Sequence, residues 1–335
     1  MVSKFHFFVI KLKALFLPTI ICLFILFLLI FSSTNLIAAK QGLYLWANSV
    51  LPSLLPFLIA TELLGYTNII KSLGKLLNKF MYPIFNVPGE GAFALIMGIV
   101  SGYPIGAKIV SNLKDNGSCN SIQAERLLAF TNNSGPLFIV GTIGIGLFNS
   151  FSIGITLLIT HILSSITVGI LFRWWKRADE KTLRAHSYNI DSSSLNFFNL
   201  GEILSKSILN SINTSLIIGG FIVLFSIIIS ILQSSHILVI LSNILRLIGL
   251  PDFLSEALLM GFIEVTNGLS CVSNLLYVNL NFKIILCAFI LGFGGFSVLL
   301  QILSIISKSN ISVKPYFIGK LLQAFLAAFY TYLII

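Results

Sequence analysis

Residues 89–113 read GEGAFALIMGIVSGYPIGAKIVSNL, in which an apolar limb, a polar and glycine-rich break and a second limb follow one another. Residues 254–275, LSEALLMGFIEVTNGLSCVSNL, repeat this arrangement. Neither limb alone reaches the roughly 20 apolar residues that a spanning helix needs. Because broken backbone at membrane depth is tolerated only beside protein or water, both stretches predict re-entrant helical hairpins, which occur in transporters built from repeats.

The composition indicates that lipid surrounds much of the chain. Of its 335 residues, 56% are hydrophobic and 10% are charged, and the mean hydropathy is +0.99. Soluble domains contain about 25% charged residues. We therefore expect an all-α polytopic membrane protein. Apolar runs long enough to span a bilayer lie at 14–39, 43–64, 121–149, 151–175, 203–233, 282–306 and 314–335.

The first apolar run follows Lys4, Lys11 and Lys13, as expected of a cytoplasmic tail before a first span or of a signal peptide. Its apolar stretch, 14–31, exceeds the roughly 7–15 residues of a signal-peptide core. We favour a cytoplasmic tail and a retained first transmembrane helix within 1–42, with cleavage as the alternative.

The two halves of the chain resemble each other in the order of their segments. A span, a short amphipathic segment, a hairpin, a broken span and a further span occur twice, and LIMGIVSGYPIG at 95–106 matches LLMGFIEVTNGL at 258–269. We predict a first repeat at 43–175, a cytoplasmic loop at 176–199 and a second, inverted repeat at 200–335. The amphipathic segments, 68–83 and 236–248, are expected to lie flat at the interface.

The distribution of basic residues supports this topology. If each hairpin returns to its own side and the N-terminus is cytoplasmic, all but three of the 21 lysines and arginines fall on the cytoplasmic side. The exceptions are Lys40, Arg246 and Lys283. Such a bias is the positive-inside pattern, and it places the C-terminus on the opposite side.

Candidate substrate-binding residues lie at the breaks and beside them. Unpaired backbone groups cost several kcal/mol in lipid, so two matching breaks predict a polar chamber rather than a structural kink, which is the alternative. Half-helix ends that point inward suit a polar or charged solute. The candidates are Ser101, Gly102, Tyr103, Pro104, Gly106, Lys108, Asn132, Asn133, Ser134, Gly135, Glu264, Thr266, Asn267 and Ser297.

Two charged candidates carry specific hypotheses. A charge such as Glu264 at bilayer depth costs about 2.5–3.5 kcal/mol on insertion scales. It is expected to bind a coupling ion or proton or to orient substrate; the alternative is an ion pair with Arg126 or Lys108. Lys108 could attract an anion or be an end charge at the cytoplasmic surface. His161 is expected to be a core histidine.

Several function classes lack their motifs. The sequence contains no HExxH, GxSxG or P-loop, and its four cysteines, Cys22, Cys119, Cys271 and Cys287, show no metal-binding spacing. We expect no catalytic residues, no metal site and no cofactor. The basic segments lack the interleaved aromatic residues of a nucleic-acid surface, so no nucleic-acid partner is expected. Uphill transport would need an ion gradient or a partner, and sodium and protons both remain candidate coupling ions.

Four segments resemble one known family. They are LPSLLPFLIATELL (51–64), FNVPGEGAFALIMGIVSGYPIGAKIV (85–110), ERLLAFTNNSGPLFIVGTIGIGLF (125–148) and GFIEV (261–265). They are similar to the YlbJ (SpoVV) family of sporulation integral membrane proteins, in the group with the nucleoside-recognition Gate domain. The resemblance extends over about 43–335. The second hairpin, which reads EVTNGLSCVSN after Ile263, matches the family pattern less regularly.

The resemblance implies a fold similar to that of concentrative nucleoside transporters, with Gate-like repeats. It implies a multi-pass protein of the outer forespore membrane that moves dipicolinic acid for maturation of the spore core and cortex. The expected partners are a small anionic substrate and the lipid bilayer, with a second copy or other sporulation membrane proteins as further candidates. The alternatives are a structural membrane protein for cortex assembly, or a nucleoside or ion carrier of the same fold.

Overall fold

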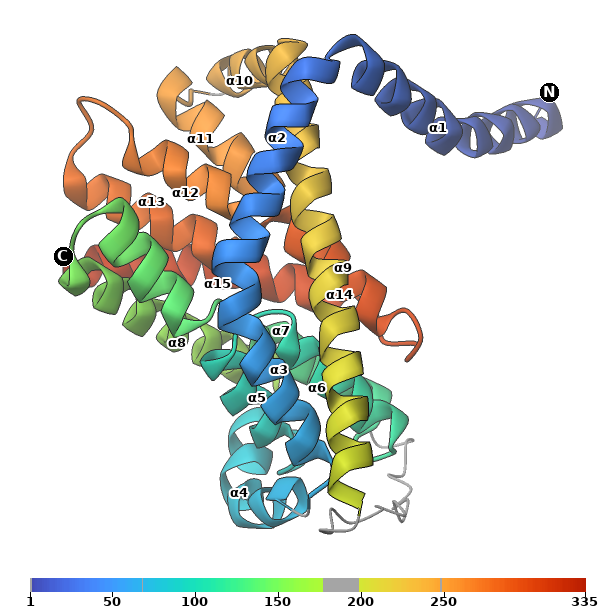
Figure 1. The fold of residues 1–335 in the computed structure, drawn as a ribbon, viewed down its shortest axis with the longest axis vertical. Coiled ribbons are helices and arrows are strands. Elements are labelled where there is room, and N and C mark those ends of the chain that lie inside the picture. Colours follow the sequence, from blue (N-terminus) through green and yellow to red (C-terminus); the bar gives the residue numbers. More distant parts are fainter. Residues whose placement is uncertain (1, 68, 177–198, 248) are drawn as a thin grey trace.

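The computed structural model describes residues 2–67, 69–176, 199–247 and 249–335, and these ranges are helices joined by turns and short breaks (Figure 1). Four of the described helices are long and apolar enough to span a membrane, and a bent pair at the N-terminus could add a fifth. The chain is therefore an all-α polytopic membrane protein. All but the ends of the expected loop at 176–199 lies outside the described residues.

The N-terminal helices depart from the expected boundary. α1 (Val2–Ile30) and α2 (Ser32–Leu45) meet at Phe31 with a bend of 99°. From there the helix continues through a π-helical segment, η1 (Trp46–Val50), and α3 (Leu51–Gly65). The run 14–39 is thus not one straight span. The boundary expected between residues 42 and 43 falls inside α2, which continues through it without a break. The polar run SSTN at 32–35 directly follows the bend, but it lies inside a stretch that is apolar enough overall to be taken for one span.

The remaining elements occur in the repeated order expected from sequence. The first set is α4 (Ile69–Phe85), α5 (Gly91–Val100), α6 (Ile105–Asp115), α7 (Ser121–Thr131), π-helical η2 (Leu137–Leu147) and α8 (Phe151–Phe172). The second set is α9 (Leu200–Ser234), α10 (Ile237–Leu247), α11 (Asp252–Ile263), α12 (Val265–Ser273), α13 (Leu280–Phe293), α14 (Gly295–Ile306) and α15 (Lys314–Ile334). We call α5–α6 hairpin 1 and α11–α12 hairpin 2. The broken spans are α7–η2 and α13–α14.

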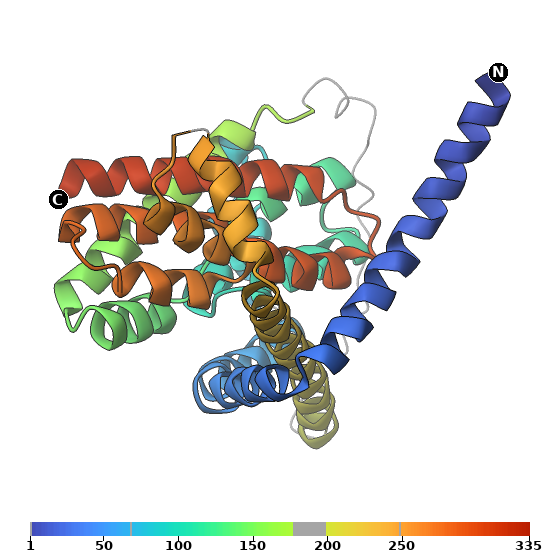
Figure 2. The ribbon, with the colours of Figure 1, turned by 90° about the horizontal axis from the view of Figure 1, so that it is seen from above.

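The helix α2–α3 packs along α9, and the two run in opposite directions (Figure 1). α4 and α10, which follow them in the chain, lie at opposite ends of the molecule. Seen from above, α2–α3 and α9 appear nearly end-on, whereas α13, α14 and α15 lie across the view (Figure 2). The opposed directions agree with an inverted repeat.

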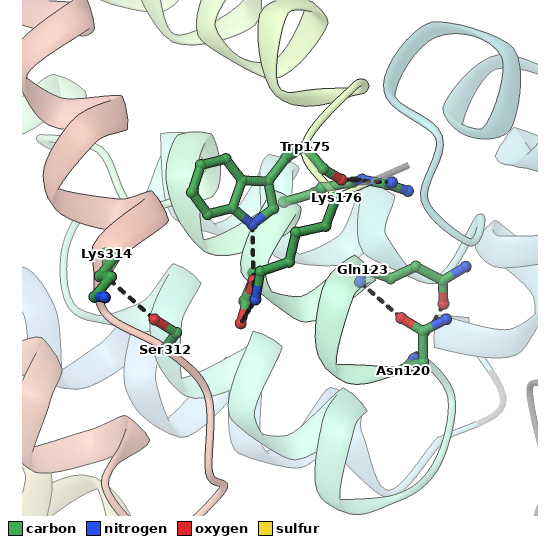
Figure 3. Close-up of polar contacts among 8 residues, drawn as sticks. Asn120, Gln123, Trp175, Lys176, Ser312 and Lys314 are labelled. Carbon is green, nitrogen blue, oxygen red and sulfur yellow. Dashed lines mark hydrogen bonds and ion pairs between the residues drawn. The ribbon is translucent and has the colours of Figure 1, made fainter. Parts of the chain in front are cut away.

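The start of α7 is anchored to the end of α8 (Figure 3). Asn120 and Gln123 form a capping box, with each side chain accepting a hydrogen bond from the other residue's backbone N–H. The Glu125 carboxylate accepts a 2.7 Å hydrogen bond from the Trp175 indole. The fully buried Arg126 guanidinium donates to the Trp175 carbonyl at 2.7 and 3.0 Å. This anchor fixes the register of the α7 helix that leads to the first break.

Candidate functional site

A cavity of about 340 Å³ lies where both hairpins and both broken spans are interrupted. Each repeat contributes to it. The polar side of its lining consists of Ser101, Gly102, Tyr103, Gly135, Thr142, Glu264, Thr266, Ser297 and Gln301. The helix α2–α3 and α9 close the apolar side, with side chains that include Leu54 and Ile222. Segments far apart in the sequence therefore share one chamber.

Hairpin 1 touches the first broken span through backbone atoms. Gly102 has φ +88°, and a Cβ there would lie 2.8 Å from the Gly135 nitrogen. A Cβ at Gly98 or at Gly106 would overlap the carbonyl oxygen of Thr131. Only residues without a side chain allow this approach. The glycines bring the two breaks together at the cavity, and the Tyr103–Pro104 peptide bond beside them is cis.

Glu264 separates the two limbs of hairpin 2 and faces the cavity. Its carboxylate caps α12 by accepting hydrogen bonds from the Asn267 backbone N–H at 2.8 Å and side-chain amide at 2.9 Å. The side chain is buried, and the residue is 7% exposed. The ion pair considered with Arg126 or Lys108 is not formed, because both cations bind elsewhere. Glu264 is thus a cavity carboxylate held by an asparagine.

Lys108 does not line the cavity. Its ammonium lies 2.6 Å from the Glu62 carboxylate and donates to the Thr214 hydroxyl at 3.0 Å. Asn210 on α9 also donates to Glu62, at 3.3 Å. Lys108 therefore ties hairpin 1 to α3 and α9. The structure does not place Lys108 among the cavity residues, and the alternative of an end charge at the cytoplasmic surface stays a prediction.

The asparagines of the first break turn away from the cavity. The Asn133 amide donates to the Phe130 carbonyl at 2.9 Å and to the Ser165 hydroxyl at 3.0 Å, and its oxygen accepts from Gln323 at 3.0 Å. Asn133 thus joins the break to α8 and α15. Its amide group is fully used within the protein.

The neighbours of Asn133 make similar contacts. Asn132 accepts from the Ala107 N–H at 3.4 Å and donates to the Tyr316 hydroxyl at 3.5 Å. The Ser134 N–H donates to Nε2 of His161 at 3.1 Å. His161 is therefore a buried histidine with a backbone partner, as expected. These contacts fix the shape of the break rather than presenting side chains to a solute.

Sequence reasoning overlooked Lys320 and Gln323. Lys320 was counted among cytoplasmic charges, but it is only 4% exposed and donates to the Gln323 side-chain oxygen at 2.7 Å. The signal was available: Tyr316, Lys320 and Gln323 are spaced so as to share one face of an otherwise apolar helix. Polar residues on one face of a spanning helix mark a protein or cavity interface.

Two cavity groups retain hydrogen-bonding capacity. The Ser101 hydroxyl and the side-chain amide oxygen of Gln301 are buried and have no hydrogen-bond partner within the described residues. The Gln301 amide nitrogen donates to Ser297 at 3.4 Å. The N-terminal ends of η2 and α14 also reach the cavity, through Leu137 and Ser297. Helix N-termini offer backbone N–H groups to anions and polar solutes.

The predicted site residues thus divide into two groups. Those that line the cavity are Ser101, Gly102, Tyr103, Gly135, Glu264, Thr266 and Ser297. Those outside its lining are Pro104, Gly106, Lys108, Asn132, Asn133, Ser134 and Asn267. Most of the second group position the first. Within the described residues, no cluster of three or more His, Cys, Asp or Glu side chains could hold a metal ion.

Comparison with known proteins gives two matches. Residues 47–173 match the Gate family, described as nucleoside recognition. The chain is 41% identical over 313 residues to the sporulation integral membrane protein YlbJ of Bacillus subtilis (strain 168). This alignment covers 89% of the chain and 76% of the relative.

Proposed function

Because the chain belongs to the family of the sporulation integral membrane protein YlbJ, we propose that it carries a small polar solute across a membrane during spore formation. The solute that we propose is dipicolinic acid, and the membrane is the outer forespore membrane, with the N-terminus in the cytoplasm. Delivery of this compound would serve maturation of the spore core and cortex.

One observation carries the proposal: four separate breaks, two from each repeat, converge on one cavity. A structural membrane protein has no need of broken backbone at membrane depth, where unpaired groups cost several kcal/mol. Inverted repeats with a central site are the architecture of secondary transporters. The cavity volume of about 340 Å³ is at the lower end of the roughly 300–1,000 Å³ of small-molecule pockets.

The cavity chemistry suits a compact aromatic solute with polar groups. The apolar wall on α2–α3 and α9 can contact a ring, and the ends of η2 and α14 can donate to carboxylate oxygens. The Glu264 carboxylate would repel a dianion unless it carries a proton or binds a cation. A coupling proton or sodium ion at Glu264 would remove this repulsion and link the solute to an ion gradient.

A nucleoside is the second candidate solute. The match of residues 47–173 to a family described as nucleoside recognition favours it. Ser101, Gln301 and Glu264 could bind sugar hydroxyls, for which a cavity carboxylate is favourable rather than repulsive. Dipicolinate would therefore bind best when Glu264 is neutralised, whereas a nucleoside would bind best when Glu264 is charged.

Uptake into liposomes containing the purified protein tests the proposal. We expect accumulation of labelled dipicolinate, competition by unlabelled dipicolinate but not by uridine, and dependence on a proton or sodium gradient. Competition by uridine alone would favour the nucleoside carrier. No uptake of either solute, with normal spores from cavity variants, would favour the structural role.

Ser101→Ala and Thr131→Val form a matched pair for this assay. Both remove a buried hydroxyl that has no hydrogen-bond partner within the described residues, but only Ser101 lines the cavity. We expect Ser101→Ala to lower uptake about tenfold, the effect of losing one hydrogen bond to a charged solute. Thr131→Val should transport normally. Equal effects of the two substitutions would count against the cavity as the binding site.

A further inference from the structure

Lys320 carries a buried amino group, and no carboxylate among the described residues forms an ion pair with it. Its ammonium donates to the Gln323 side-chain oxygen at 2.7 Å and lies 5.9 Å from the centre of the Tyr316 ring. The ion pairs found among the described residues join Lys108, Lys176 and Lys206 to glutamates, and none involves Lys320. A single amide oxygen is thus its closest partner.

An ammonium group has three donors and a full charge, and a buried charge is normally paired with an opposite charge. A glutamine in the place of a glutamate provides a dipole but no counter-charge. Leaving an ion of this kind uncompensated costs several kcal/mol. The burial of Lys320 without such a partner therefore points to a negative charge from outside the described residues.

Lys320 does not line the cavity, but hydrogen bonds link it to the first break. Gln323 donates to Asn133 at 3.0 Å, and Asn133 is two residues before Gly135, which lines the cavity. Tyr103, which also lines the cavity, packs against the hydrophobic cluster that contains Tyr316. A chain of hydrogen bonds thus connects the Lys320 ammonium, through Gln323 and Asn133, to the first break.

The charged groups on the helices packed against α15 do not compensate Lys320. On α7, Glu125 pairs with Lys176 and Arg126 binds backbone carbonyls. On α8, His161 accepts from a backbone N–H. On α13, Lys283 donates to the Ser273 carbonyl and carries the same charge as Lys320.

We propose that Lys320 makes the cavity selective for anions: its ammonium lacks a counter-ion within the described residues, and an anionic solute in the cavity supplies one. The inference rests on the proposed function and adds the residue that selects the charge of the solute. Glu264 provides the opposite charge at the break of hairpin 2.

Binding of two probes of the same shape tests the charge selection. Dipicolinate is the dianion, and pyridine-2,6-dicarboxamide is its neutral diamide; calorimetry on the full-length protein in detergent measures both. Replacing Lys320 by Met keeps the side-chain length and removes the charge. We expect Lys320→Met to weaken dipicolinate binding about tenfold or more, as loss of a desolvated charge interaction does. Binding of the diamide should change less than about twofold, and Lys320→Arg should retain preference for the dianion.

The outcomes separate the two proposals. Equal weakening of both probes, or unchanged dipicolinate binding, would overturn the role of Lys320 while leaving the carrier intact. Absence of binding of either probe to the unsubstituted protein would reject the proposed solute.

In that case the thermal stability of the protein without solute tests whether the Lys320 ammonium is structural. Removal of an uncompensated buried charge should leave the unfolding temperature of Lys320→Met unchanged or raised. A clear decrease, absent from the Lys314→Met control on the same helix, would identify a structural ammonium and overturn the inference.

Discussion

Arg126 and Lys320 are both buried basic residues, but only Arg126 has a full set of acceptors. Its guanidinium donates to the Asn86 carbonyl at 2.9 Å and twice to the Trp175 carbonyl. We expect Arg126→Met to lower the free energy of unfolding by about 3 kcal/mol or more, because two buried carbonyls lose their donor. Thermal unfolding in detergent measures this. Arg173→Met is the control, since Arg173 stacks on Trp174 and is partly exposed; a similar loss in both variants would contradict the anchoring role.

The thiol of Cys119 should be inert. It lies between α6 and α7, is 4% exposed, and burial raises its pKa to about 12. A raised pKa means less thiolate at neutral pH, and three units above the ordinary value of 9.0 correspond to roughly a thousandfold less of the reactive form. We expect alkylation of Cys119 by N-ethylmaleimide only after denaturation, as followed by mass spectrometry. Rapid labelling of the native protein would show that this turn opens.

At the scale of single residues, the sequence located polar groups but could not orient them. Glu264 stands out as a charge in an apolar stretch, and the structure does place it at the cavity. Asn133 stands out equally, yet its side chain faces α8 and α15. Which side of a break a side chain takes depends on long-range packing. The burial of Lys320 was missed because counting positive charges along the chain uses position alone and contains no information on burial.

At the scale of elements, close packing of hairpin 1 on α7 sets the position of the first break. We expect Gly98→Ala and Gly106→Ala each to destabilise the protein by about 1–3 kcal/mol, the usual range for overpacking, and to abolish solute uptake. In both cases the added methyl group would overlap the Thr131 carbonyl oxygen. Gly65→Ala serves as the control, because a Cβ there would meet nothing within 4 Å. Normal stability and uptake in the first two variants would mean that the hairpin can shift without consequence.

Local chemistry made most of the elements predictable. Glycine, proline and asparagine interrupt the runs at 101–106 and 132–136, and helices end at both places. No glycine or proline marks the bend at Phe31, but the polar run SSTN at 32–35 beside it is a break signal that the prediction of a single span did not use. There α2 packs on α9 through Gly42, where a Cβ would lie 2.8 Å from the Ser226 hydroxyl. Contacts between residues this far apart in sequence leave no local pattern.

At the scale of the whole molecule, the direction of insertion remains a prediction from charge. With hairpins that return to their own side, the segment 176–199 should be cytoplasmic and the C-terminus should lie on the opposite side. Fusions of a reporter that is active on one side only, placed at 67–68, within 176–199 and after Ile335, would test this. Equal reporter activity within 176–199 and after Ile335 would contradict an odd number of crossings in the second repeat.

The tie between hairpin 1 and the α3–α9 pair offers a test of movement in the whole molecule. Alternating access requires some of the cavity-forming elements to move relative to others. The ion pair of Lys108 with Glu62, at 2.6 Å, joins hairpin 1 to α3. We expect Glu62→Cys with Lys108→Cys, joined by a short thiol-specific cross-linker, to stop solute uptake while leaving solute binding intact, and we expect cleavage of the linker to restore uptake. The two single-cysteine variants, treated with the same reagent, control for loss of the ion pair. Full uptake by the cross-linked protein would mean that hairpin 1 stays fixed to α3 during transport, and the moving part would then have to be sought in the second repeat.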